Sequence, residues 1–297
     1  MQWVLPMSES YLLDASRWLL HHEPAVRLSV FFTIFVLMAA WEVAVPRRAR
    51  RLPRKRRWTG NLGIVFLNTA LLRWLLPMGA VTFAMTAQAH GWGLLNHSGW
   101  PFALAVAGSV IALDFAIYLQ HVMFHAVPPL WRLHRVHHAD LDCDVTTGAR
   151  FHPIEIGLSM GIKLAVIAVL GTPAVAVLLF EVLLNATAMF NHGNVRVPQP
   201  VDAALRLLLV TPDMHRVHHS IEEDETNSNF GFNLSVWDRL FGTYKAQPDA
   251  GHEGMTIGIR DHRDPKEIAD LTAILALPFL AANGGYAIHR RQWRASS

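Results

Sequence analysis

Apolar stretches of about twenty residues are the feature that most restricts the fold of this sequence. About 20 apolar residues in a helix cross a hydrocarbon core about 30 Å thick. Such stretches lie at residues 28–45, 62–85 and 101–119. A longer tract at 154–190 is interrupted by Gly171, Thr172 and Pro173, which predict a hairpin of two segments. The sequence therefore predicts an all-α polytopic membrane bundle with about four spans, or two helical hairpins.

Composition and charge agree with this interpretation. Only 16% of the residues are charged and 52% are hydrophobic, whereas an ordinary soluble domain carries about 25% charged residues. The net charge of +3 comes largely from a basic run at residues 47–57, beside an apolar stretch rather than interleaved with aromatic residues. We therefore expect no nucleic-acid partner. The run is interpreted as a cytoplasmic loop, with docking of an acidic redox partner as the less favoured alternative.

This orientation determines where the later segments emerge. With residues 47–57 in the cytoplasm, the second span leads out and the third returns, so residues 121–152 lie on the cytoplasmic side. The hairpin at 154–190 enters and comes back, which places the chain after residue 191 on that same side. Two distant histidine-rich regions are thereby predicted to meet at the cytoplasmic face.

The two ends of the chain are predicted to lie at the membrane interface or inside the protein. The N-terminal segment does not resemble a cleavable signal peptide, and it is expected to form an interfacial amphipathic helix. Its predicted anchors are Trp3, Tyr11, Leu12, Trp18 and Leu19. An apolar segment at 271–288 contains Pro278 and is predicted to be buried or interfacial. The predicted organisation is residues 1–100 with the first two spans, 101–245 with the histidines, and 246–297 as a tail.

Histidine is unusually abundant, with seventeen residues against a single cysteine, Cys143. A lone cysteine excludes a disulfide framework and cysteine-based zinc or iron–sulfur sites, so imidazole must hold any metal. Many of the histidines recur at i, i+3 and i+4, spacings that share one face of a helix. One HxxxH group and two HxxHH groups are present: His121 and His125; His134, His137 and His138; and His215, His218 and His219.

Eight imidazoles exceed what one tetrahedral or octahedral metal ion can use, so two metal ions are predicted. Iron is favoured, because neutral nitrogen ligands with open positions suit dioxygen chemistry near a lipid phase. Zinc is the alternative, since imidazole suits it equally. Under that alternative the protein would be a non-catalytic zinc-binding membrane protein or transporter.

These groups match the eight-histidine signature of the fatty acid hydroxylase and sterol desaturase superfamily, which the chain resembles over roughly residues 105–244. Neighbouring words agree, including His152-Pro153, Asn191-His192-Gly193 and Asn229-Phe230-Gly231. The resemblance implies a membrane bundle with a cytosolic, histidine-rich helical cap, two non-haem irons, dioxygen as co-substrate, and hydroxylation or desaturation of a lipid. It also implies that His192 completes the ligand set, while a ligand role for His152 stays open.

Three further residues are candidates for catalytic roles near the metals: Asp114 and Tyr118, which precede the first group on the same helical stripe, and Asn229. The alternatives are a salt bridge from Asp114 to Arg132 or Arg135, an interfacial aromatic role for Tyr118, and a turn at Asn229. Acidic side chains are expected to orient the metal-bound imidazoles. The candidates for this role are Asp114, Glu155, Asp213 and Asp238.

Missing motifs restrict the partners and the cofactors. The chain has no HExxH, GxGxxG or haem-attachment word, so the electrons are expected to come from a separate redox protein. An apolar tunnel is expected to take the lipid, but sterols, hopanoids, fatty acyl chains, alkylglycerol ethers and carotenoids all remain open as substrates. Its predicted lining is Ile156, Leu158, Met160, Phe180, Leu184 and Met189.

Overall fold

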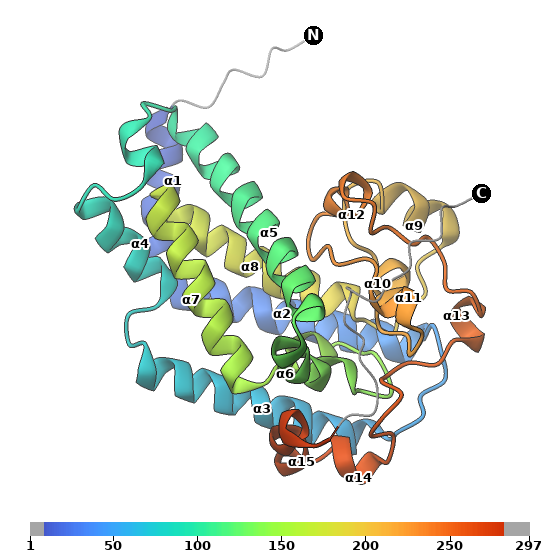
Figure 1. Ribbon diagram of the computed structural model, residues 1–297. Coiled ribbons are helices and arrows are strands. Elements are labelled where there is room, and N and C mark those ends of the chain that lie inside the picture. The colour runs from blue at the N-terminus through green and yellow to red at the C-terminus, as the bar shows by residue number, and fades with distance from the viewer. Residues whose placement is uncertain (1–8, 282–297) are drawn as a thin grey trace.

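The computed structural model describes residues 9–281, and this part of the chain is built from helices without an extended strand (Figure 1). The prediction of an all-α fold is confirmed. The short helices and loops after α8 form a cap on the long helices, with α9 to α13 at the right of Figure 1 and with α14 and α15 at the bottom, against α3. The longer helices are α1 Glu9–His21, α2 Glu23–Ala44, α3 Arg54–Leu75, α4 Ala80–Ala89, α5 Phe102–Ala126, α6 Pro128–His138, α7 Pro153–Leu170 and α8 Ala174–Asn191. The cap holds α9 Gln199–Leu205, α10 Pro212–His218, α11 Glu223–Thr226, α12 Val236–Leu240, α13 Gly251–Gly254, α14 Pro265–Ile268 and α15 Leu271–Ala276.

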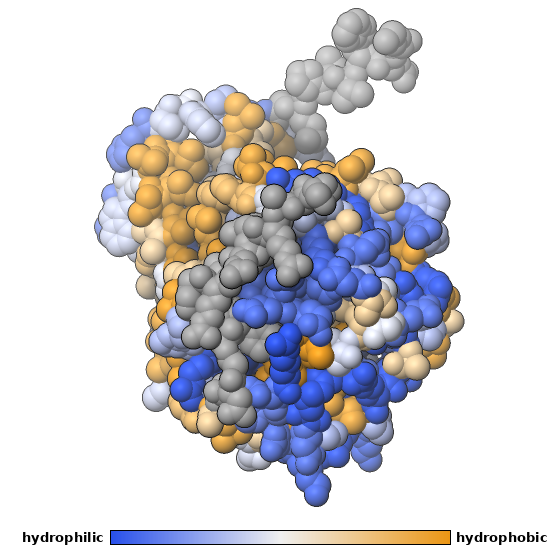
Figure 2. All heavy atoms as spheres, turned by 45° about the vertical axis from the view of Figure 1, so that its right-hand side comes forward, coloured by the Kyte–Doolittle hydropathy of each residue, from blue (hydrophilic) through white to orange (hydrophobic). Residues whose placement is uncertain are grey.

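Five helical segments are long and apolar enough to cross a membrane, and the chain is an integral membrane protein. These segments are Glu23–Ala44, Arg54–His97, Phe102–Ala126, Pro153–Leu170 and Ala174–Asn191. Large apolar side chains such as Phe66, Trp74 and Val169 are exposed on them, as expected of helix faces that contact lipid. Figure 2 shows hydrophobic side chains gathered at the upper left and along the left edge of the molecule, and hydrophilic ones gathered over the centre and right of that face.

The second predicted span differs from the structure. The stretch at 62–85 was expected to be one helix, but α3 already begins at Arg54 and ends at Leu75, and α4 begins only at Ala80. The break contains Pro77, whose ring removes a backbone N–H and disfavours helical geometry at the preceding residue. Helix α2 also begins earlier than predicted, at Glu23, and α5 continues to Ala126.

The predicted hairpin at 154–190 is present as α7 and α8. Its turn begins at Gly171, which has a left-handed backbone with φ of 69°, a conformation that glycine adopts without strain. A Cβ atom at this position would lie 2.6 Å from the carbonyl oxygen of Trp92. Pro173 then precedes α8. The tight turn places the start of α7 and the end of α8 at the same end of the bundle.

The basic run at 47–57 has a structural role in addition to its predicted orientation role. Arg57 is buried, and it donates to Asp140 at 2.7 Å and to Asp144 at 2.5 Å. Asn61 donates to the same Asp140 carboxylate at 3.1 Å. Burial alone would raise the pKa of Asp140, but the Arg57 charge and its hydrogen bonds hold it at about 2. This buried network fastens α3 to the loop that follows α6.

The chain ends are only partly described. Helix α1 forms as predicted, with Tyr11 and Trp18 exposed, while Trp3 lies outside the described residues. In the C-terminal segment, α15 packs against α3 and its Ile274 side chain is buried. The described part of the segment at 271–288 is thus held against the protein, and residues 282–288 lie outside the described range.

Replacing Arg57 with methionine is expected to destabilise the protein by about 3–5 kcal/mol, because two buried carboxylates lose their counter-charge. Unfolding of the purified protein in detergent, followed by circular dichroism, measures the change. Lys55→Met is the matched control, since Lys55 is exposed on the same helix, and a surface change of this kind costs within about 0.5 kcal/mol. Equal effects of the two substitutions would contradict a structural role of the Arg57 network.

Candidate metal centre

Four helix ends bring the predicted histidines together at the boundary between the long helices and the cap. The last two turns of α5 carry His121 and His125, and α6 starts only two residues after α5 ends, so the chain reverses and places the α6 histidines opposite them. His192 is the C-cap residue of α8. Helix α10 carries the third group, with His219 as its C-cap residue. All nine side chains are buried.

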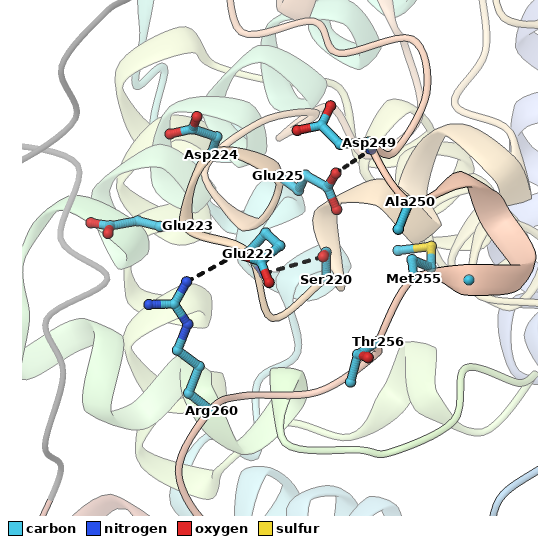
Figure 3. Close-up of a pocket in the computed structure, with 11 residues that line it drawn as sticks. Ser220, Glu222, Glu223, Asp224, Glu225, Asp249, Ala250, Met255, Thr256 and Arg260 are labelled. Atoms are coloured by element: carbon cyan, nitrogen blue, oxygen red, sulfur yellow. Dashed lines mark hydrogen bonds and ion pairs between the residues drawn. The ribbon is translucent and has the colours of Figure 1, made fainter.

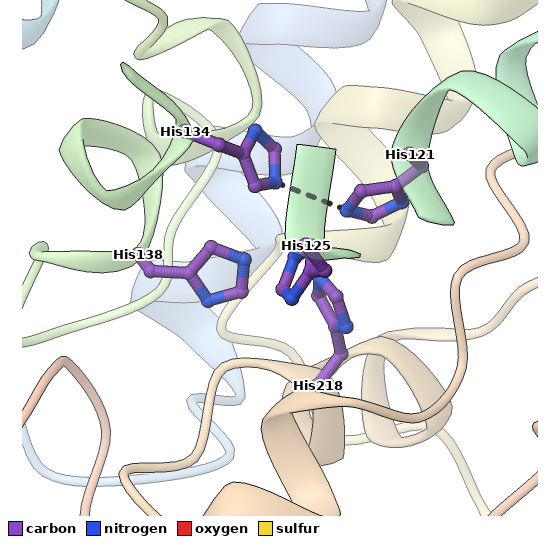
Figure 4. A group of neighbouring side chains, drawn as sticks. All are labelled: His121, His125, His134, His138 and His218. Atoms are coloured by element: carbon purple, nitrogen blue, oxygen red, sulfur yellow. Dashed lines mark hydrogen bonds between the residues drawn. The ribbon is translucent and has the colours of Figure 1, made fainter. Parts of the chain in front are cut away.

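The nine histidines form two groups that are each suited to one metal ion. Within each group, one ring nitrogen from every member lies within 4.8 Å of those of all the other members. The larger group, drawn in Figure 4, contains His121, His125, His134, His138 and His218. The smaller group contains His137, His192, His215 and His219. The two HxxHH words are each divided between the groups, so each helix that carries one serves both sites.

The distances between ring nitrogens fit ligands of a common ion. The Nε2 atoms of His121 and His134 lie 3.1 Å apart. In the smaller group, Nε2 of His192 lies 3.1 Å from that of His137 and 2.9 Å from that of His215. Two nitrogens at about 2.1 Å from one metal, and at right angles, would be separated by about 3.0 Å. The residues present therefore fit two imidazole-bound metal ions.

Hydrogen bonds from Nδ1 orient several of these rings. The Nδ1 atom of His121 lies 2.9 Å from the carbonyl oxygen of Phe230, and that of His218 lies 2.7 Å from the carbonyl oxygen of Ser228. His192 makes the same contact with the carbonyl of Ala188 at 2.8 Å. A carbonyl oxygen can only accept, so the proton is on Nδ1 and the lone pair is on Nε2, as a metal ligand requires.

Burial also sets the protonation state of the rings. Burial lowers the pKa of His134, His137, His138 and the three α10-region histidines well below the ordinary value, and neighbouring imidazoles lower most of them further. Burial also lowers the pKa of His192, to about 4. Buried Nε2 atoms of His125, His138 and His218 have no hydrogen-bond partner among the described residues. A cluster of neutral imidazoles with free lone pairs is the protonation state that binds metal.

Among the predicted acidic orienters, Glu155 is the one that contacts a histidine of the two groups. Its Oε1 atom accepts from Nδ1 of His134 at 2.6 Å. Asp238 contacts a histidine only indirectly, through Phe230. It accepts from the backbone N–H of Phe230 at 2.7 Å, and the carbonyl oxygen of Phe230 faces His121. Burial raises the pKa of Asp238 to about 6. Asp213 instead pairs with Arg47 and Arg216.

The three candidate catalytic residues lie outside the two histidine groups. Asp114 accepts from the indole N–H of Trp237 at 2.8 Å and from two backbone N–H groups at 3.3 Å, so it fastens residues 233–237 to α5. Tyr118 lies with its hydroxyl 3.1 Å from that of Thr243. The catalytic assignments of Asp114 and Tyr118 stay predictions, and their contacts here are those of positioning residues.

The salt bridge from Asp114 to Arg132 or Arg135 does not form, because both arginines donate to backbone carbonyls of residues 277–280. Asn229 has the turn geometry, with φ of 52°, and its side chain donates to the carbonyl oxygens of Met214 and Lys245. Its catalytic role stays a prediction. His152 caps α7 by accepting from the N–H of Ile154 at 3.2 Å, outside both groups.

Sequence reasoning missed other contacts of the site. Phe151 stacks on the ring of His137, with centroids 4.5 Å apart, and Trp131 packs beside His125 at 4.8 Å. Asn227 Oδ1 lies 3.2 Å from Nδ1 of His125. Aromatic residues close to a histidine word could have suggested the first two contacts. The carbonyls of Ser228 and Phe230 carry no side-chain signal.

A cavity of about 640 Å³ lies among the long helices and reaches the histidines. His121, His134 and His137 contribute to its wall, together with Phe124 and Phe151. Of the six predicted tunnel residues, Ile156, Met160 and Leu184 line it. The other three do not: Leu158 is exposed on the outer side of α7, while Phe180 and Met189 are packed in hydrophobic clusters. A periodic pattern does not distinguish these faces of an apolar helix.

A second pocket, of about 630 Å³, lies on the cap and is rich in carboxylates (Figure 3). Arg260 donates to Glu222 at 3.0 Å, and Glu225 accepts from the backbone N–H of Asp249 at 2.6 Å. None of the nine histidines lines this pocket. It is therefore separate from the metal centre.

The histidine-bearing region of the chain is similar to known proteins. Residues 105–243 match the family described as fatty acid hydroxylase. Ornithine lipid hydroxylase OlsE of Rhizobium tropici is 31% identical over 176 residues, covering 58% of this chain and 51% of that protein. Human alkylglycerol monooxygenase is 29% identical over 165 residues, covering 54% of this chain and 34% of that protein. The Delta(7)-sterol 5(6)-desaturase of Eremothecium gossypii is 30% identical over 158 residues, 52% of this chain and 41% of that protein.

The chain thus spans about half or less of the length of these relatives. No solved structure matches.

Replacing Glu155 with glutamine is expected to weaken metal binding by about 10–100-fold, because the carboxylate orients the His134 ring and raises its basicity. Metal titration of the chelator-treated protein, followed by elemental analysis, measures the affinity. His152→Ala serves as the control: His152 lies three residues before Glu155 and outside both groups, so its loss is expected to leave the metal content unchanged. Normal affinity in Glu155→Gln would contradict the orienting role.

Proposed function

Residues 105–243 belong to the fatty acid hydroxylase and sterol desaturase superfamily, and on this basis we propose that the protein is a membrane-bound di-iron oxygenase that hydroxylates or desaturates a C–H bond of a lipid. The observation that carries the proposal is the junction of two buried imidazole groups with a cavity among membrane-spanning helices. The volume of this cavity, about 640 Å³, lies within the range of about 300–1,000 Å³ typical of small-molecule sites.

Iron is the proposed metal at both sites. One iron would be held by the larger group, His121, His125, His134, His138 and His218. The other iron would be held by the smaller group, His137, His192, His215 and His219. Activation of dioxygen toward an unreactive C–H bond is the chemistry that two bound irons supply. Hydroxylation with dioxygen consumes two electrons and two protons, places one oxygen atom in the product and releases the other as water. A separate redox protein is proposed to deliver the electrons on the cytoplasmic side.

The chain's own residues orient the substrate and keep the site dry. His121, His134 and His137 meet the cavity at one end, so a lipid chain lying in it would present a C–H bond to both groups. The rings of Phe124 and Phe151 line the same end and exclude water from it. Because water competes for reactive intermediates, an apolar wall at this point favours reaction with the lipid.

The names of the relatives support a membrane lipid with a polar head as the substrate class. Those proteins are named for ornithine lipids, alkylglycerols and sterols. Common to these compounds are a long apolar body and one polar end, and the cavity has an apolar wall with polar residues in places. We propose hydroxylation as the first reaction to test, since the relative that matches over 176 residues, ornithine lipid hydroxylase OlsE, is named a hydroxylase.

The function is tested with protein purified in detergent and loaded with ferrous iron. Supplied with membrane lipid extract, a chemical reductant and ¹⁸O₂, it is expected to give one lipid product that carries a single ¹⁸O atom or that has lost two hydrogens. Mass spectrometry detects either product. His137→Ala, which removes a ligand of the smaller group, is expected to abolish the product, whereas Arg17→Met, an exposed change on α1, is expected to have no effect.

Two outcomes would contradict the proposal. One is tightly bound zinc with no oxygen consumption under any reductant, which would favour the non-catalytic zinc protein. The other is full turnover and unchanged iron content in His137→Ala.

A further inference from the structure

Four charged side chains lie at the end of the cavity that is remote from the histidines. They come from α2, α7 and α8 and are here called the charged quartet: Glu23, Arg27, Lys163 and Glu181. Glu181 accepts from Lys163 and from Arg27, each at 2.6 Å, and Arg27 also donates to Glu23 at 2.8 Å. The three helices lie within apolar spans, where ionisable residues are costly and usually mark a functional site.

A polar stripe connects the quartet to the metal centre. On α7, Glu155, Ser159 and Lys163 follow at i, i+4 and i+8, so they lie on one face of the helix, and all three line the cavity. Gln120, next to His121, donates to Ser159 at 3.0 Å. The buried Oε1 atom of Gln120 and Oε2 atom of Glu155 have no partner among the described residues. A purely hydrocarbon ligand would leave this stripe unsatisfied.

The two ends of the cavity are a fixed distance apart. Lys163 lies eight residues beyond Glu155 on α7, which corresponds to about 12 Å along the helix. Glu181 lies eleven residues before His192 on α8, or about 17 Å. A ligand that bound at both ends would therefore present to the histidines a carbon about 12–17 Å from its polar group.

The charges of the quartet indicate the kind of polar group. The four paired side chains of the quartet balance in charge, with two cations and two anions, while Arg73 also lines the cavity but is exposed. A ligand with a net charge would therefore leave an uncompensated charge beside the partly buried quartet. Arg27 and Lys163 keep further N–H donors beyond the three bonds given above, and Glu23 accepts one hydrogen bond among the described residues. A headgroup with one anionic and one cationic centre would bind to both signs and leave the site neutral.

We propose that the charged quartet binds the zwitterionic headgroup of a membrane lipid and thereby sets which carbon of that lipid reaches the metal centre. This rests on the proposed function for the identity of the reaction, but the binding step needs neither iron nor turnover.

Binding is tested on metal-free, full-length protein in a non-ionic detergent, with two probes of the same acyl chain: lysophosphatidylcholine, which is zwitterionic, and monoacylglycerol, which is uncharged. Native mass spectrometry gives both dissociation constants. The wild type is expected to prefer lysophosphatidylcholine by at least about tenfold, equal to about 1.4 kcal/mol.

The informative variant is the double substitution Lys163→Met with Glu181→Gln. It removes one charge of each sign, so it avoids the lone buried charge that can prevent single variants from folding. It is expected to bind both probes with a ratio near one. Arg17→Met, in the exposed pair with Asp14, is the matched control and is expected to keep the wild-type preference.

Equal binding of the two probes by the wild type, or an unchanged preference in a folded double variant, would overturn the proposal and show that the quartet is a structural ion network. The failure of the proposed function is distinguishable from this result. Iron-loaded protein that oxidises lipids without headgroup preference would leave the oxygenase intact and refute the quartet's role. Selective binding of the zwitterionic probe without any oxidation of lipids would do the reverse.

Discussion

The structure depends on keeping nine buried imidazoles neutral with their lone pairs directed at two points. Nitrogens only 2.9–3.1 Å apart cannot all be protonated, and without a cation between them their lone pairs repel. The helices around the centre are connected so that their histidines meet. The short connection after α5 turns α6 back against it, the turn at Gly171 returns α8 to the same end as the start of α7, and α10 closes the group from the cap.

The surrounding hydrogen bonds give each ring a direction. Carbonyl oxygens of the loop at 228–230 orient His121 and His218, and this loop is itself held by Asp238 and by the side chain of Asn229. On the opposite side, the buried Arg57 network fixes the loop after α6. These hydrogen bonds hold the rings in place without the help of a metal, which lowers the cost of ordering the ligands when a metal binds.

Local patterns predicted much of this site, and non-local contacts account for what was missed. The spacings of the three histidine groups are helical, so the sequence was enough to place their members on common faces. It also predicted the hairpin, because Gly171 and Pro173 act locally. The division of each HxxHH word between two metal groups was not predictable, since it depends on how α6 and α10 face each other.

The roles of isolated polar residues were harder to predict. Asp114 and Asn229 were expected near the chemistry, but their contacts fasten loops of the cap. The sequence predicts Arg57 only as part of a basic loop that orients the chain in the membrane. In the structure it pairs with a carboxylate more than eighty residues later. In each case the partner is distant in sequence or is a backbone group, and neither leaves a recognisable spacing. The boundaries at residues 100 and 245 stay predictions.

X-ray absorption at the iron edge of the purified protein tests whether two imidazole-bound irons occupy the centre. We expect two irons per chain, each surrounded by light ligands at about 2.1 Å with the outer scattering of imidazole rings and no sulfur. A single iron per chain, or a ligand shell dominated by carboxylate oxygen or containing sulfur, would contradict it.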